Sequence, residues 1–326
     1  MLCILNDHVD PYFNLALEEY LLKEFNHECF MLWRNEPSII IGKNQNTLAE
    51  INLEYVREHG IKVVRRLSGG GAVFHDLGNL NFTFIINDTQ DSFCDFRKFT
   101  APIIEVLAKL GIKAELSGRN DLTVSGLKFS GNAQFKHKDR LLHHGTILFS
   151  AAIPDITAAL QVNPDKFEGK GIKSVASRVT NIQSHLSQPL TIEELEIMIR
   201  DHMASDRENY TLYSLTPMDI DKVNQLVQEK YATWEWNYGV SPRYNLRNKA
   251  RIAGSSIEVL LDVKDGIIQN ARIFGDFFSK CDISLIEESL VGVKHEEKAV
   301  TAVFSRFQFQ DYIADVNVAE FINLLF

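Results

Sequence analysis

The spacing of apolar and polar positions over residues 1–111 predicts helices alternating with short strands. Asp10 followed by Pro11 is typical of a helix start. Apolar side chains then recur at helical spacing at Phe13, Ala16, Leu17, Tyr20 and Leu21. Strands are predicted at 30–33, 38–41, 61–64 and 80–86, the last with Leu80, Phe82, Phe84 and Ile86 on one face. A helix over 99–110 should end at Gly111.

Residues 112–150 have the pattern of a β-meander. Ser125-Gly126 is a hairpin signal between apolar runs, and the polar run 136–140 predicts a further turn before a strand at 141–149. Two helices then follow from their capping residues. Thr191 with Glu194 starts the first, and Thr216-Pro217 starts the second.

The stretch 234–248 (WEWNYGVSPRYNLRN) is aromatic and then rich in turn residues, and we place a domain boundary within it. A new set of elements follows. Runs at 257–263 and 267–274 flank a Lys-Asp-Gly turn, which predicts a hairpin, and Asn317 caps a last helix. The length of 326 residues also favours about two domains. We therefore expect domains at 1–245 and 246–326.

Composition narrows the class of protein. The chain is 45% apolar and 24% charged, as in ordinary globular proteins, and no apolar run approaches the roughly 18 residues of a membrane helix. We read no signal peptide at its start, and its four cysteines are widely separated with no CxxC pair, so a reducing cytoplasm is expected without a zinc site or disulfide framework. A net charge of −9 argues against nucleic acid as the main partner, and no membrane partner is expected.

The segment RRLSGGGAVFHDLGN (65–79) carries the clearest chemistry. Three consecutive glycines let the backbone approach a ligand and direct several N–H groups at an anion, and Arg65 and Arg66 add positive charge beside them. The segment is neither a Walker loop nor a dinucleotide fingerprint, because the required lysine and third glycine are missing. The alternative is a flexible hairpin with two exposed arginines.

The segments GRND (118–121) and LKFSGNA (127–133) also suit an anionic ligand. Strand alternation places Lys128 and Ser130 on one face, and a lysine can act as a point charge against carboxylate and phosphate oxygens. Asp121 can hold a Mg²⁺ ion that bridges such oxygens. The alternatives are a solvated strand lysine and a turn-capping aspartate.

Two further segments add candidate residues. His143 and His144 are adjacent on a predicted strand, so only one of them faces a site, and a substrate-lining or structural role is favoured over metal binding. The stretch 163–183 is rich in Gly, Lys and Ser without a period, and a loop of this length is usually functional or disordered. Its Lys170, Lys173 and Arg178 suit closure over a phosphate; the alternative is a solvated basic loop.

Taken together, these segments resemble the lipoate–protein ligase family. The motifs that carry the resemblance are RRLSGGGAVFHDLGN (65–79), SGRNDL (117–122), KFSGNA (128–133), HHGTIL (143–148) and KGIKSVASRVTN (170–181), in that order. NLALEEYLL (14–22), LWRN (32–35) and WEWNYG (234–239) also look like the family. The resemblance spans most of residues 1–240. Beyond about 250 the chain resembles the family's small accessory domain more weakly.

The resemblance implies an α+β fold and a two-step reaction. The catalytic domain would be a mixed β-sheet flanked by helices, like that of class II biotin synthetases, followed by a smaller α/β accessory domain. Lipoate and Mg-ATP would give lipoyl-AMP and pyrophosphate, and the lipoyl group would pass to a lysine of a lipoyl domain. The acceptor would belong to a 2-oxoacid dehydrogenase subunit or to the glycine-cleavage H protein.

Site residues also follow from the resemblance. Lys128 would be catalytic, touching both the lipoate carboxylate and the α-phosphate, and Asp121 would hold Mg²⁺. The implied ATP-binding residues are Arg66, Gly71, Ala72, Val73, Phe74, Asn79, Lys128, Lys173 and Arg178. The implied lipoate-binding residues are Trp33, Ser68, Gly70, Gly71, Lys128 and His144. In the adenylate-binding loop 169–181, Ala176 stands where some family members carry Arg.

Three alternatives stay open at this point. An octanoyl- or lipoyl-transferase of the same superfamily works through an acyl-cysteine, but no cysteine occurs between 95 and 280. A biotin ligase would carry a GRGR-type loop, which this chain lacks. A non-catalytic lipoate-binding relative is disfavoured because Lys128 and the complete loop are retained.

Overall fold

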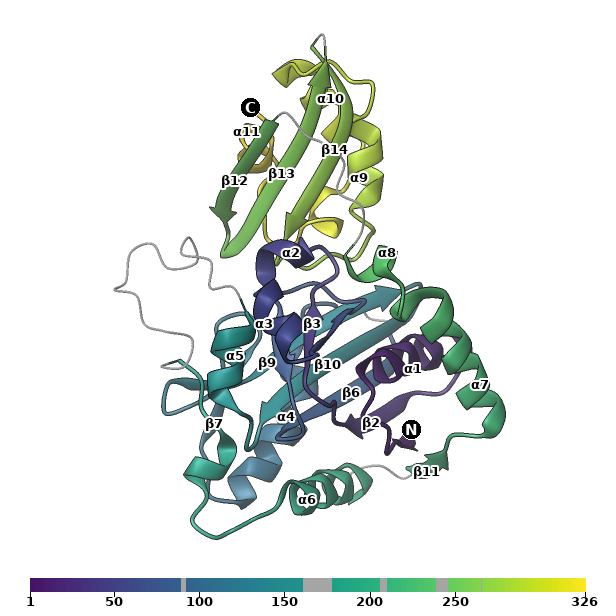
Figure 1. Ribbon diagram of the computed structural model, residues 1–326, viewed down its shortest axis with the longest axis vertical. Helices are drawn as coiled ribbons and strands as arrows, with labels where there is room; N and C mark the ends of the chain where they lie inside the picture. Colours follow the sequence, from purple (N-terminus) through teal and green to yellow (C-terminus); the bar gives the residue numbers. More distant parts are fainter. Residues whose placement is uncertain (89–91, 161–177, 206–209, 239–245, 265) are drawn as a thin grey trace.

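The computed structural model describes residues 1–88, 92–160, 178–205, 210–238, 246–264 and 266–326. The elements before residue 239 form a larger body, and those from residue 246 form a smaller one stacked above it along the long axis (Figure 1). The catalytic segments identified above all lie in the larger body or outside the described residues.

A mixed eight-stranded sheet forms the centre of the larger body. Its strands, in spatial order, are β11 (Thr211–Ser214), β1 (Leu2–Leu5), β2 (Cys29–Trp33), β6 (Asn79–Asn87), β10 (Arg140–Leu148), β9 (Leu127–His137), β8 (Asp121–Val124) and β7 (Ala114–Ser117). Strand β1 pairs parallel with both of its neighbours, and the other pairs are antiparallel. The predicted β-meander is confirmed as β7 to β10.

Helices cover both faces of this sheet (Figure 1). On one face α4 (Phe96–Lys109) and α6 (Ile192–Ser205) pack on the apolar side of β6, which includes Phe82 and Phe84. On the other face α1 (Pro11–Glu24) and α7 (Pro217–Leu226) pack on residues such as Ile85. The predicted start of α1 is confirmed, since Asp10 accepts hydrogen bonds from two backbone N–H groups of its first turn. The mixed sheet with flanking helices is thus the expected fold.

A small three-stranded sheet lies against the face that carries α1. It consists of β4 (Lys62–Arg65), β3 (Ser38–Ile41) and β5 (Val73–His75), in that order. Short helical segments surround the two sheets: α2 (Thr47–Glu50), α3 (Leu53–Glu58), α5 (Ile153–Ala159), η3 (Ile182–His185), η4 (Val227–Tyr231) and α8 (Trp234–Asn237). The glycine-rich segment connects the end of β4 to the start of β5, which lie on either side of the same end of β3.

The smaller body is an antiparallel sheet with helices on one side (Figure 1). Its elements are β12 (Leu246–Ile252), β13 (Ser255–Lys264), β14 (Ile267–Gly275), α9 (Ser284–Leu290), α10 (Glu297–Phe304), η5 (Phe309–Asp311) and α11 (Val318–Asn323). The hairpin β13–β14 is confirmed. Strand β12, which begins at Leu246 inside the turn-rich stretch 234–248, was not predicted from the sequence. Its alternating arginine and lysine residues point to solvent, which gave the strand the composition of a loop.

Other differences concern short or terminal segments. Strands β1 and β11 were not predicted; they pair with each other across about two hundred residues of sequence, and such a contact has no local signal. Helix α4 begins at Phe96 with Asp95 as its cap, one turn earlier than expected, and α11 ends at Asn323. Among the described residues, no helix has both the length and the apolar character needed to cross a membrane.

Candidate active site: two cavities that share a lysine

Two neighbouring cavities open at the centre of the larger body. The first, of about 120 Å³, lies between the glycine-rich segment and strands β2, β6 and β10. The second, of about 560 Å³, lies between β5, β8 and β9 and extends to α5. Ala72, Val73, Lys128, Gly131 and Thr146 line both cavities. The shared wall places Lys128 where ligands in the two cavities would meet.

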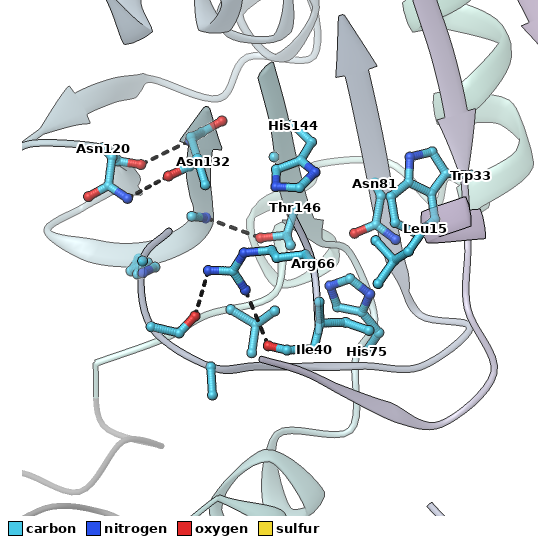
Figure 2. Close-up of a pocket in the computed structure, with 18 residues that line it drawn as sticks. Leu15, Trp33, Ile40, Arg66, His75, Asn81, Asn120, Asn132, His144 and Thr146 are labelled. Atoms are coloured by element: carbon cyan, nitrogen blue, oxygen red, sulfur yellow. Dashed lines mark hydrogen bonds between the residues drawn. The ribbon is translucent and has the colours of Figure 1, made fainter. Parts of the chain in front are cut away.

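Most of the expected site residues line one of these cavities. In the first lie Trp33, Arg66, Gly70, Gly71, Ala72, Val73, Lys128 and His144 (Figure 2). In the second lie Ala72, Val73, Phe74, Asn79, Asp121, Lys128 and Arg178. Ser68 lines neither, but its hydroxyl contacts Arg66 and His144. Lys170, Lys173 and Ala176 lie outside the described residues.

Arg66 supports the glycine-rich loop through hydrogen bonds to its backbone carbonyls. Its guanidinium donates to the carbonyls of Gly69 and Gly71 at 2.7 and 2.8 Å and to Ser68 Oγ at 3.0 Å. Burial lowers the pKa of Arg66 to about 10, so the side chain stays a cation at neutral pH. The alternative of a hairpin with two exposed arginines was wrong, since Arg65 and Arg66 are 8% and 6% exposed.

Arg65 faces away from both cavities, contrary to the expectation that its charge lies beside the ligand loop. Its donors are all directed at the chain, to the carbonyls of Gly42, Lys43, Gln45, Trp236 and Asn237 and to Thr47 Oγ1. This side chain therefore ties the aromatic segment 234–237 to the loop after β3, a structural role.

The smaller body covers the glycine-rich loop from the outside. Gly70 N–H donates to the carbonyl of Phe277 at 3.4 Å, and a Cβ at Gly69 would overlap with that same carbonyl. The Arg119 guanidinium lies 4.3 Å from the ring centroid of Phe278 and donates to Ser255 Oγ at 3.0 Å. Glycine is required here because the loop is held between Arg66 on one side and a second backbone on the other.

Lys128 is positioned through its backbone as well as its side chain. Its N–H donates to the carbonyl of Arg178 and its carbonyl accepts from Thr180 N–H, both at 2.8 Å. The strand residue is thereby fixed to the chain that leaves the segment 161–177. Its Nζ lies 2.7 Å from Asp121 Oδ1, and each side chain is a little over one-third exposed. The ammonium is therefore paired yet accessible to a ligand.

Asp121 is suited to Mg²⁺ only with help from a ligand. Among the described residues, no group of three or more His, Cys, Asp and Glu side chains is placed to hold a metal ion. Protein Mg²⁺ sites commonly use one or two carboxylates together with phosphate oxygens and water. A single accessible carboxylate in the second cavity fits that pattern.

A buried polar network forms one wall of the first cavity. Trp33 Nε1 donates to Thr83 Oγ1 at 2.8 Å, and Thr83 donates to Glu18 Oε1 at 2.6 Å. His144 Nδ1 lies 3.0 Å from the same carboxylate, and its Nε2 lies 2.6 Å from Ser68 Oγ. Through Ser68, which also accepts from Arg66, the network connects the indole of Trp33 to the glycine-rich loop and so fixes the shape of the cavity.

The sequence interpretation missed Glu18 and Thr83. Glu18 follows an apolar run on a helix, and Thr83 occupies the polar half of the alternation at 80–86, yet both side chains are buried. The polar residues of this alternating strand could have indicated the site, because Asn79 and Asn81 on the same strand line the cavities. The prediction that only one of the adjacent histidines faces the site is confirmed. His144 lines the first cavity, whereas His143 stacks on Phe99, with ring centroids 4.6 Å apart.

Comparison with known proteins defines the chain as a two-part ligase. The family model described as the lipoyl protein ligase A/B catalytic domain matches residues 10–204, and that of the bacterial lipoate protein ligase C-terminus matches residues 241–325. The chain belongs to the lipoate–protein ligase family. It is 48% identical to the lipoate-protein ligase LplJ of Bacillus subtilis, and the match covers 100% of both chains. It is 45% identical to lipoate–protein ligase 1 of Staphylococcus aureus, and that match covers 98% of both chains.

Solved structures agree. The chain superposes on Plasmodium falciparum LipL1, crystallised in complex with lipoate, with a TM-score of 0.77 and 28% identity over 99% of this chain and 97% of that one. It also matches a lipoate-protein ligase A bound with ATP, with a TM-score of 0.63 and 25% identity over 74% and 98% of the two chains. A bipartite ligase from Thermoplasma acidophilum, described with its E2 lipoyl domain, gives a TM-score of 0.65 and 28% identity over 75% and 98%.

Proposed function

We propose that the two cavities divide one adenylation reaction between them, and that Lys128 serves both. The first cavity would hold lipoate with its carboxylate toward Lys128, and the second would hold ATP with its α-phosphate toward the same ammonium. The observation that carries this proposal is that Lys128 lines both cavities at their shared wall. Relatives crystallised with lipoate and with ATP support the pairing of ligands.

The chemistry required of the protein is mainly electrostatic. Attack of a carboxylate on the α-phosphate brings two anions together, so positioning and charge stabilisation dominate the rate. Lys128 supplies a cation at the junction, and Gly71 and Ala72 of the glycine-rich loop line the same cavity with it. Asp121, together with phosphate oxygens, would hold Mg²⁺, which supplies further neutralisation of the phosphate charge.

The second step would transfer the lipoyl group to the ε-amine of a lysine on a lipoyl domain. The ligase described with its E2 lipoyl domain supports a 2-oxoacid dehydrogenase subunit as one acceptor class. The glycine-cleavage H protein is the other acceptor that we propose. Because the adenylate is labile to water, its site must exclude water between the two steps. We also propose Lys173 as an ATP-binding residue; it lies outside the described residues.

We also propose that the division into residues 1–245 and 246–326 is functional. Phe277 and Phe278 of the smaller body lie on the glycine-rich loop and on Arg119. An acceptor lysine needs access to the adenylate, so the smaller body would move aside between the two steps. Interfaces of moderate size between domains make such motion the ordinary expectation.

The test is the mass of a purified lipoyl domain after incubation with this protein, lipoate and Mg-ATP. One lipoyl group should be added to the domain, with release of one pyrophosphate, and omission of ATP should abolish both. Lipoate-dependent pyrophosphate release without acceptor modification would mean that the acceptor is wrong. Absence of both signals with E2-type and H-type acceptors would refute the proposed ligase activity.

A further inference from the structure

The end of the first cavity away from Lys128 contains two polar atoms without partners. Trp33, His75, Asn81 and Leu15 lie together on the side of the cavity opposite Asn120 and Asn132 (Figure 2). The Lys128 ammonium lies beside Gly131, which precedes Asn132 in the chain, so it belongs to that other side. His75 and Asn81 are 3% and 1% exposed. Within the described part of the chain, His75 Nε2 and Asn81 Nδ2 find no hydrogen-bond partner. Buried polar atoms are nearly always paired, so these two require an explanation.

The tautomer of His75 is set by a chain of amides behind it. The two hydrogens of Asn14 Nδ2 are shared among three acceptors, the carbonyls of His8 and Arg34 and Asn35 Oδ1, so the oxygen of the Asn35 amide faces Asn14. Asn35 Nδ2 then lies 3.1 Å from His75 Nδ1 and must donate to it. The ring proton is therefore on Nε2, the atom without a partner. Burial lowers the pKa of His75 to about 3, so the ring is neutral at working pH.

The other polar groups of this wall are already satisfied. The indole N–H of Trp33 is used by Thr83, and both ring nitrogens of His144 are used by Glu18 and Ser68. Asn81 Oδ1 accepts from Asn79 Nδ2 at 2.9 Å, which leaves its NH₂ group as a donor. Among the described residues, two neutral donors thus remain unpaired at this end of the first cavity, and the neighbouring Asn79 Oδ1, whose residue lines the second cavity, remains as an acceptor.

We propose that His75 Nε2 and Asn81 Nδ2 form a sulfur-binding subsite for the dithiolane ring of the acyl substrate and make the enzyme prefer lipoate to octanoate. The inference rests on the proposed use of this cavity for the acyl chain. Divalent sulfur is a weak hydrogen-bond acceptor that suits neutral donors, and it makes favourable contacts with aromatic rings. Trp33 supplies such a ring, its centroid 6.0 Å from that of His75.

The consequence for specificity follows from the donors rather than from cavity size. The terminal methyl group of octanoate would displace water from His75 and Asn81 without replacing its hydrogen bonds. Sites that hydrogen-bond a substrate group reject the analogue without it, because their own polar atoms are left unpaired. Sulfur is a weak acceptor, so we expect a preference for lipoate over octanoate of only about tenfold.

The experiment compares kcat/KM for lipoate and octanoate, measured by pyrophosphate release, in the wild type and in His75→Phe. The phenylalanine keeps a ring and removes one of the two donors, so the ratio of lipoate to octanoate should fall about threefold, and about tenfold in the double variant with Asn81→Leu. Asn81→Leu should lower the ratio as well. His59→Phe, at an exposed histidine that lines neither cavity, makes the same exchange of side chains and should leave the ratio unchanged.

The outcomes separate this inference from the proposed function. An unchanged ratio in a folded His75→Phe protein, with lipoate still activated by the wild type, would overturn the subsite alone. A wild type that activates neither acid would instead refute the proposed function. If His75→Phe does not fold, a crystal structure of the wild type with lipoate decides. A ring sulfur within hydrogen-bond distance of Nε2 supports the subsite, and a water molecule there with the ring elsewhere overturns it.

Discussion

Replacing Lys128 with alanine should leave the protein folded. The ion pair of Lys128 with Asp121 is partly exposed, with side chains 38% and 37% accessible, so it contributes at most about 1 kcal/mol to the free energy of unfolding. The backbone bonds of Lys128 to Arg178 and Thr180 do not depend on its side chain. The melting temperature should therefore shift by only a few degrees, about 2–4 °C per kcal/mol for a chain of this size.

The rate of adenylate formation should fall much further than the stability. Lys128 is the cation at the junction of the two cavities, where charge would build up as the carboxylate meets the α-phosphate. Removing one such preorganised donor costs about 100- to 1000-fold in kcat, or about 3–4 kcal/mol. The double variant Lys128→Ala with Asp121→Asn should lose still more activity, because Asp121 is also the proposed Mg²⁺ ligand.

The assay is lipoate-dependent release of pyrophosphate, run beside thermal melting of each variant. Asp121→Asn alone is the matched control, because it breaks the same ion pair and keeps the ammonium. It should retain more activity than Lys128→Ala at saturating Mg²⁺. A folded Lys128→Ala protein that keeps more than about a tenth of the wild-type rate would refute the role assigned to this lysine.

Three further predictions follow. Replacing all four cysteines with alanine should preserve activity, because no cysteine among the described residues lines either cavity; loss of activity in a folded variant would favour an acyl-cysteine transferase. Burial lowers the pKa of His75 from 6.5 to about 3, so between these pH values the residue is protonated only in the unfolded chain. The free energy of unfolding should therefore drop by about 2 kcal/mol from pH 7 to pH 5. Burial lowers the pKa of His143 as well and adds to the drop; urea titrations of the wild type and His75→Phe at both pH values measure the His75 part. A protein truncated after Tyr238 should keep the transfer of preformed lipoyl-AMP better than adenylation, and equal loss of both half-reactions in a protein that still melts cooperatively would contradict this.

Local signals explain what could be predicted from the chain alone. The Asp10 cap, the Thr191–Glu194 capping box and the hairpin turn at Ser125 each depend on residues within one turn of each other, and each is present in the structure. The glycine-rich segment and Lys128 were found because unusual residue types occur at close spacing. They meet at one wall because β9 pairs with β10 in the large sheet and because the small sheet, in which β5 pairs with β3, packs against it; neither arrangement has a local signal in the sequence.

The residues that were missed depend on contacts between distant segments. Glu18 reads as a solvent-facing helix residue until strands β6 and β10 bring Thr83 and His144 against it. The same holds for Arg65, whose charge suggested ligand binding. Its true partners lie in the loop after β3 and, about 170 residues later, at Trp236 and Asn237. Burial of a charged side chain is a property of the assembled sheet and has no local signature.

The position of β1 in the large sheet has a consequence for synthesis of the chain. Strand β1 lies between β2 and β11, so one of its edges stays open until residues 211–214 leave the ribosome. Its sequence, LCIL, is apolar, and an open apolar edge strand is a template for pairing with another chain. The larger body closes this edge before the accessory domain, which begins at β12, has been made. A released chain truncated before residue 211 should therefore depend on chaperones far more than a released chain truncated after residue 238.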